Sequence, residues 1–156
     1  MMAVKVMVYV GDGLDLRRAA PGLGGRRGVS QLVRRAAAAA MRDAGVRDAS
    51  LSVALMPDSG IAELHERYLG EPTPTDVLSF AFYEQGEAPL GDVYIGLEQA
   101  ARQADSLGVQ LEEELARLAI HGTLHILGHD HPVGAGRERS SMWKLQERIL
   151  WQLMES

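Results

Sequence analysis

The sequence predicts an α+β domain built on a small mixed four-stranded sheet packed with about five helices. The chain has 156 residues, close to the usual size of one domain, so a single domain covering residues 1–156 is expected. Strand-like and helix-like segments alternate early, and helical segments dominate the end. Apolar residues make up 46% and charged residues 24%, which is typical of a folded globular chain.

The expected strands and helices follow from composition and from the alternation of apolar and polar residues. We expect strands at residues 3–10, 50–56, 76–82 and 91–95, and helices at residues 30–44, 57–69, 96–107, 110–127 and 134–155. The first strand is rich in Val, and the second alternates apolar and polar residues. Six glycines and Pro21 within residues 11–28 predict a loop. Ser30 is the expected N-cap of the first helix, and Gly45 is its stop.

Turn residues separate the later elements. Residues 70–74 read Gly-Glu-Pro-Thr-Pro and break the second helix. The polar residues 83–90 predict a hairpin-like connection between the third and fourth strands. Apolar residues recur at helical spacing in residues 110–127, which predicts a long amphipathic helix.

Charge is unevenly distributed along the chain. The net charge is −5, but residues 1–50 carry +5 and residues 51–156 carry −10. Fourteen of the sixteen basic residues are Arg, which suits phosphate recognition better than Lys does. A solvated arginine surface explains the same composition equally well. The sequence shows no membrane-spanning segment, so we expect a cytoplasmic protein.

Histidine spacing predicts a metal site at the end of the long helix. The chain has no Cys, so a metal must be held by His, Asp or Glu. His121 and His125 are one helical turn apart and can reach one ion. Gly128 permits the left-handed turn that brings His131 back over the helix end. Three imidazoles and an open position are the usual arrangement of catalytic zinc, which would polarise a substrate oxygen.

Two other interpretations of these histidines compete with the catalytic metal site. Histidines at a helix end are also favoured by the helix dipole without any metal, but three at this spacing favour metal binding. The spacing H-x-x-x-H-x-x-G-x-x-H is shared with metzincin proteases. Those enzymes carry a Glu base after the first His, where this chain has Gly122, so the protease mechanism lacks its base.

The motif around these histidines resembles that of a known family. Residues 121–131, HGTLHILGHDH, are similar to the H-G-x-L-H-L-x-G-x-D-H motif of the YbeY family, the bacterial endoribonucleases of rRNA maturation. Residues 74–80, PTDVLSF, and residues 90–95, LGDVYI, resemble two further family segments. The resemblance covers about residues 50–155. It implies one zinc ion on His121, His125 and His131, cleavage of single-stranded RNA, 16S rRNA 3′-end processing and ribosome quality control.

The chain also departs from the family pattern. Many members have an Arg after the aromatic residue that precedes the PTDVLSF segment, whereas here Tyr68 is followed by Leu69. Arg67 is therefore a candidate helper in catalysis or RNA contact. The position often occupied by Tyr is His129, and the Gly- and Arg-rich residues 20–28 have no counterpart.

Other polar residues near the motifs are candidates for the site. Thr75, Asp76 and Ser79 are candidate substrate-cleft residues, and Asp130 is a second candidate helper. Each of these has a plainer structural explanation as a capping or strand-edge residue. The nucleophile is either water activated by the metal or the substrate's 2′-hydroxyl.

The expected partners are an rRNA precursor and the small ribosomal subunit. Two competing functions remain open. One is a different zinc-dependent hydrolase, and the other is a non-catalytic ribosome-associated factor whose structural zinc is closed by His129.

Overall fold

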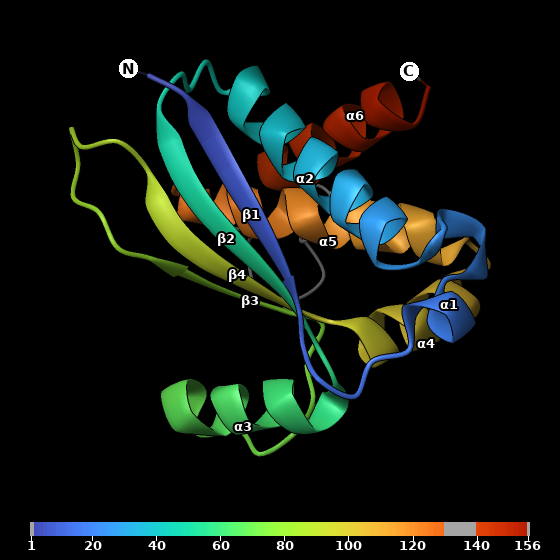
Figure 1. Ribbon diagram of the computed structural model, residues 1–156. Helices are drawn as coiled ribbons and strands as arrows, with labels where there is room; N and C mark the ends of the chain where they lie inside the picture. Colours follow the sequence, from blue (N-terminus) through green and yellow to red (C-terminus); the bar gives the residue numbers. More distant parts are fainter. Residues whose placement is uncertain (1, 130–139, 156) are drawn as a thin grey trace.

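A computed structural model describes residues 2–129 and 140–155, and it has four strands in one mixed sheet (Figure 1). The strands are β1 (Val4–Val10), β2 (Ala49–Met56), β3 (Val77–Ala81) and β4 (Leu90–Gly96). Their order is β1-β2-β4-β3. The strands β1, β2 and β4 are parallel to one another, and β3 pairs antiparallel with β4. The predicted mixed four-stranded sheet is therefore confirmed.

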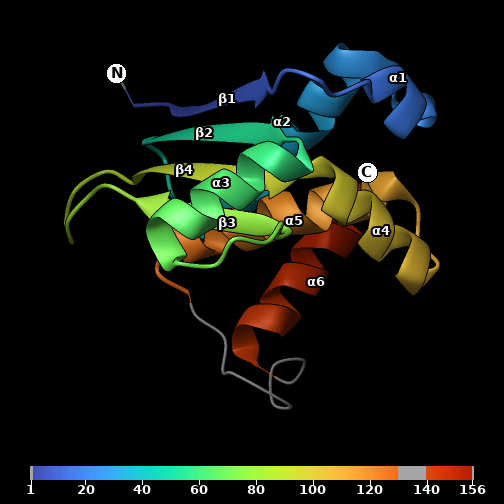
Figure 2. The same ribbon diagram turned by 90° about the horizontal axis from the view of Figure 1, so that it is seen from below.

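The described residues contain six α-helices. They are α1 (Leu16–Ala19), α2 (Gly25–Asp43), α3 (Asp58–Leu69), α4 (Leu97–Leu107), α5 (Leu111–Ile126) and α6 (Ser141–Glu155). The helix α2 packs on β1, α5 packs on β3 and β4, and α6 packs against both helices. The helix α3 lies at the carboxyl ends of β2 and β4, as the view from below shows (Figure 2). None of the described helices is long and apolar enough to cross a membrane.

The core lies between the sheet and the α2–α5 layer. The burial of β2 alternates, with Leu51, Val53 and Leu55 buried toward the helices. Five successive alanines lie within α2, and three of them, Ala36, Ala37 and Ala40, are fully buried. Small side chains on α2 allow this helix to approach α5 closely. The helix α5 is the central helix of the domain, because it packs on α2, α4, α6, β3 and β4.

The predicted loop at residues 11–28 is wrong. It contains α1, a 3₁₀ turn (Pro21–Leu23) and the first turn of α2. Asp15 caps α1 by accepting a hydrogen bond from the Arg18 amide, and Leu16 is buried. Burial of apolar residues outweighs the low helix propensity of the glycines here.

The predicted start of the first helix is also wrong. The N-cap of α2 is Gly24, whose φ of 74° is accessible to glycine, and Ser30 lies inside the helix. The last helix was expected from residue 134, and its described part begins at Ser141.

Candidate metal centre and substrate pocket

The helix α5 carries the predicted metal ligands and lies directly against the sheet. A Cβ atom built on Gly122 would be 2.6 Å from Cγ1 of Val93 and 3.1 Å from Oγ of Ser79. Gly122 therefore permits a close approach of α5 to β4, which a residue with a side chain would allow only by displacing β4. Gly122 lies on the buried face of the helix.

His121 and His125 face each other on the half-buried edge of α5. Their ring centroids are 4.6 Å apart, with the planes at 73°. Their Nε2 atoms are 3.1 Å apart. Two nitrogens bound at about 2.0–2.1 Å to one tetrahedral zinc ion are about 3.3 Å apart, so the pair fits two ligand positions of such an ion.

The structure adds Gln146 of α6 to this site, a residue that the sequence analysis missed. Its Oε1 accepts a hydrogen bond from Nδ1 of His121 at 2.6 Å, and its side chain is almost fully buried. Its Nε2 donates to Glu147, which orients Oε1 toward the histidine. Because Nδ1 of His121 carries the proton, Nε2 presents its lone pair toward His125.

A buried ion-pair network continues from Gln146. Arg117 of α5 donates to Glu114 at 2.8 Å, to Glu113 at 3.1 Å and to Glu147 at 3.0 Å. Glu114 is only 2% exposed and also accepts from Gln103 of α4. Burial alone would lower the pKa of Arg117, but the hydrogen bonds to Glu147 and Glu114 outweigh burial and raise it. Arg117 thus joins α4, α5 and α6 beside the histidines.

The end of α5 has the turn that the sequence predicts. Gly128 has a φ of 94°, and its amide donates to the His125 carbonyl at 3.0 Å. The His129 amide donates to the Leu124 carbonyl at 3.0 Å, which completes a Schellman cap. Tyr83 donates to the Ile126 carbonyl from the loop after β3. The predicted ligand His131 and the predicted helper Asp130 lie outside the described residues, within which no group of three His, Asp or Glu forms a metal cluster.

A pocket of about 280 Å³ opens beside His121. Its lining includes Asp76, Gln103, Arg117, Trp143 and Gln146. Of the predicted cleft residues, Asp76 thus shares a pocket with the first histidine.

The other two cleft residues make local hydrogen bonds. Ser79 donates to the Gly122 carbonyl at 3.2 Å and so contacts the backbone of α5, the helix that carries the predicted metal ligands. Thr75 is within 3.5 Å of the Asp76 carboxylate, which also accepts the Val77 amide at 2.8 Å. These contacts fix the orientation of Asp76 at the start of β3.

Arg67 lies on an exposed part of α3. It forms an ion pair with Glu63 at 3.3 Å, and both side chains are mostly exposed. Leu69, which stands where many family members have Arg, is 60% exposed. Neither residue lines the pocket beside His121.

The fold and the site together define a class of protein. A mixed α+β domain carries a helical histidine pair with an oriented tautomer, and the first histidine lines a pocket with polar and apolar walls, an arrangement typical of histidine-metal hydrolases. The chain belongs to the endoribonuclease YbeY family, whose model matches residues 25–154.

Curated relatives support this assignment. The chain is 42% identical over 132 residues to an endoribonuclease YbeY of Thermus thermophilus, covering 80% of this chain and 91% of that protein. It is 44% identical over 129 residues to one from Moorella thermoacetica, covering 76% and 80%. The solution structure of TM1509 from Thermotoga maritima matches the fold with a TM-score of 0.56 at 23% identity, covering 97% of this chain and 89% of that one.

Proposed function

We propose that this protein is a zinc-dependent endoribonuclease that cleaves single-stranded RNA. We further propose that it binds one zinc ion per chain through His121, His125 and His131. Its substrate would be an rRNA precursor, processed at the 16S 3′ end in the cytoplasm in contact with the small ribosomal subunit, with a role in ribosome quality control. The membership of the endoribonuclease YbeY family supports the reaction class.

One observation carries the metal assignment. The Nε2 atoms of His121 and His125 are 3.1 Å apart, and Gln146 holds the tautomer in which Nε2 of His121 carries the lone pair that would bind metal. A buried acceptor on Nδ1 is the arrangement that usually orients a metal-binding histidine. When bound, zinc supplies Lewis-acid stabilisation of charge that develops on a phosphate oxygen.

The chain's own groups supply positioning and proton transfer. Asp76 shares the pocket with His121, and the Val77 amide and Thr75 fix one of its oxygens, Oδ1. No contact with the other described residues occupies Oδ2. We assign this oxygen to accept the proton of the attacking hydroxyl, because Gly122 removes the base that metzincin proteases use. Glu114 lines the same pocket but is held by Arg117.

The two competing functions make different demands on the site. A peptidase of the metzincin type needs a carboxylate at residue 122, and a Cβ there would be only 2.6 Å from Val93. A structural zinc needs a fourth protein ligand, for which His129 is the candidate. Both are less well supported than the nuclease.

Cleavage of a labelled single-stranded fragment of the rRNA 3′ end tests the proposal. The purified protein should cleave it, chelation should abolish cleavage, and zinc should restore it. His125→Ala should be inactive, whereas the matched control His65→Ala should be active, because His65 lies on α3 and contacts Thr73. Equal behaviour of all samples would overturn the proposal.

The chemistry of the product ends identifies the nucleophile. A 2′,3′-cyclic phosphate indicates attack by the substrate's own 2′-hydroxyl. A 5′-phosphate without a cyclic product indicates attack by water. Asp76→Asn should slow either reaction about a hundredfold or more at saturating RNA if Asp76 is the base.

A further inference from the structure

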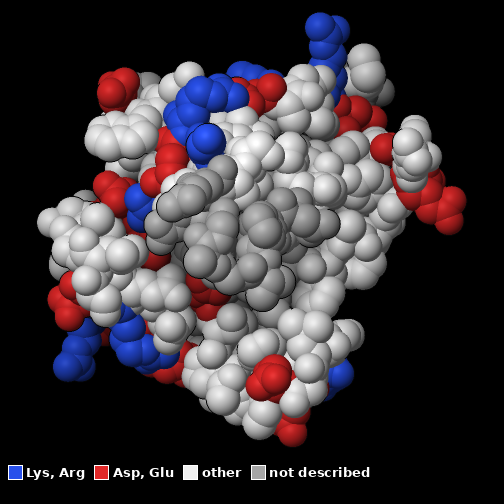
Figure 3. Space-filling view, turned by 180° about the vertical axis from the view of Figure 1, so that it is seen from behind, with Lys and Arg blue, Asp and Glu red and all other residues white. Residues whose placement is uncertain are grey.

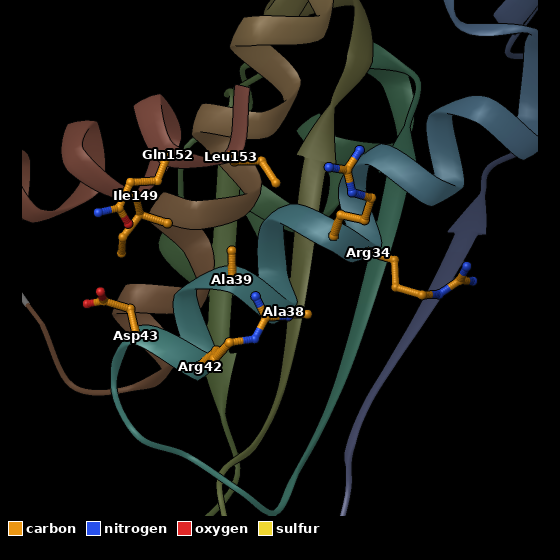
Figure 4. A pocket seen from close by; sticks show the side chains of 9 residues that line it. Arg34, Ala38, Ala39, Arg42, Asp43, Ile149, Gln152 and Leu153 are labelled. Atoms are coloured by element: carbon orange, nitrogen blue, oxygen red, sulfur yellow. The ribbon is translucent and has the colours of Figure 1, made fainter. Parts of the chain in front are cut away.

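A second concavity lies between α2 and α6. It has a volume of about 550 Å³ and is separate from the pocket beside His121, with which it shares no residue. Arg34, Arg35 and Arg42 of α2 form one side, and Ile149, Gln152 and Leu153 of α6 form the other. Figure 4 shows Ala38 and Ala39 between these two sides. We refer to this concavity as the α2–α6 groove.

The α2–α6 groove is positively charged although the whole chain is acidic. The only acidic residue in its lining is Asp43. Asp43 makes a two-pronged ion pair with Arg148 of α6, at 2.8 and 3.1 Å, so its charge is balanced. Arg34 and Arg42, which have no carboxylate partner among the described residues, therefore give the lining a net positive charge in a chain whose net charge is −5.

Two arginines of this groove, Arg34 and Arg42, differ from those after residue 50. Every described arginine in that later part, namely Arg67, Arg102, Arg117 and Arg148, is paired with a carboxylate. On the face seen from behind, basic groups accordingly lie beside acidic ones (Figure 3). Within the described residues, the Arg34 side chain donates only to the Val6 carbonyl, and the Arg42 side chain makes no ion pair or hydrogen bond. Both guanidinium groups are available to an external anion.

The spacing of these two arginines favours an extended anion. Arg34 and Arg42 are eight residues apart on one helix, which is about 12 Å along its axis. That separation suits successive groups of a polyanion better than one small phosphate. The small apolar residues Ala38 and Ala39 between them let a chain lie close to the helix.

We propose that the α2–α6 groove binds the phosphodiester backbone of single-stranded RNA at a distance from the metal centre. This inference rests on the proposed nuclease function, which makes RNA a better-supported occupant than an acidic protein segment. Arginine forks match phosphate oxygens, and the apolar floor accommodates ribose and base surfaces. The helix α6 connects the two sites, because Gln146 at the histidines and Gln152 in the groove are about 9 Å apart along its axis.

Binding of a labelled single-stranded RNA, measured by fluorescence polarisation over a series of salt concentrations, tests the groove. The double variant Arg34→Gln/Arg42→Gln should bind about tenfold more weakly at 0.1 M salt, and the slope of log affinity against log salt should fall by about 1.4. Arg34→Lys/Arg42→Lys should recover part of the affinity. The matched control Arg102→Gln, on α4 and paired with Asp58, should bind like the wild type.

Three further measurements distinguish a failure of the groove proposal from unfolding of the variant and from a failure of the nuclease proposal. The single variant Arg42→Gln should already weaken binding, and since the Arg42 side chain makes no hydrogen bond or ion pair with the described residues, its effect should not come from unfolding. Cleavage at saturating RNA should be unchanged in the double variant. An RNA affinity and salt slope equal to those of the wild type would overturn the proposal. If the double variant instead loses binding of an acidic peptide while its RNA affinity is unchanged, the groove binds a protein partner, which also overturns the proposal. Absence of cleavage by the wild type, with binding reduced in the variant, would refute the nuclease and not the groove.

Discussion

Nδ1 of His121 on α5 donates to Oε1 of Gln146 on α6 at 2.6 Å, and this contact connects the two helices at the candidate metal centre. The amide is almost fully buried, and its Nε2 is engaged by Glu147. The contact therefore selects one tautomer and one orientation of the first histidine.

Removing this amide should weaken metal binding more than it weakens the fold. We expect Gln146→Leu to lower zinc affinity about 10–100-fold, because Nδ1 of His121 loses its acceptor and the ring is no longer oriented. Competition with a chromophoric chelator measures the affinity. Gln146→Glu keeps an acceptor at this position and should retain most of the affinity. Equal zinc binding by the wild type and the Leu variant would contradict the positioning role.

Gly122 should tolerate no side chain. Gly122→Ala places a methyl group 2.6 Å from Cγ1 of Val93, a stiff β-branched side chain that is fully buried. We expect a loss of about 1–3 kcal/mol in the free energy of unfolding, measured with urea.

A second helical glycine provides the control for this substitution. A methyl group at Gly60 of α3 would meet the flexible end of Met56, so Gly60→Ala should be neutral or stabilise by up to about 1 kcal/mol. Destabilisation of equal size in both variants would show that close packing against the sheet is not the cause.

Local spacing explains which parts of the site the sequence could predict. His121, His125 and Gly128 lie within one helix and its cap, so their geometry follows from helical periodicity and from the positive φ that glycine permits. Gln146 is 25 residues further on and reaches His121 only through the packing of α6 on α5. A signal was present, because Gln146 is a lone polar residue on the apolar face formed by Met142, Ile149 and Leu150.

The same reasoning explains the errors in the fold. The strands and the helices α3, α4 and α5 have strong periodic patterns, and their predicted bounds agree closely with the structure. The glycine-rich residues 11–28 have no such pattern. Their helical turns depend on tertiary burial of Leu16 and Ala20, which local propensity does not show.

His129 should be dispensable for both stability and metal binding. Its amide completes the cap of α5, a role that any residue with a backbone N–H can fill, and its side chain makes no hydrogen bond or ion pair with the other described residues. We expect His129→Ala to change the free energy of unfolding by less than about 0.5 kcal/mol. Zinc affinity should also be unchanged. A strong loss of either would support a closed structural zinc site in place of an open catalytic one.

Arg117 should be the ion-pair residue on which stability depends most. Its partner Glu114 is 2% exposed, so Arg117→Met leaves a buried carboxylate without its cation. We expect this change to cost about 3–5 kcal/mol, measured by urea unfolding. Arg102→Met is the matched control, because Arg102 and Asp58 are partly exposed and their pair should contribute less than about 1 kcal/mol.

A second substitution separates lost charge pairing from lost packing. Glu114→Gln removes the buried charge while keeping the shape and the contact with Gln103. In the Arg117→Met background, Glu114→Gln should therefore restore about 1–3 kcal/mol, whereas in the wild type the same change should destabilise. If the two effects simply add, the cost of Arg117→Met comes from packing. In that case the network would not depend on the charge of Glu114.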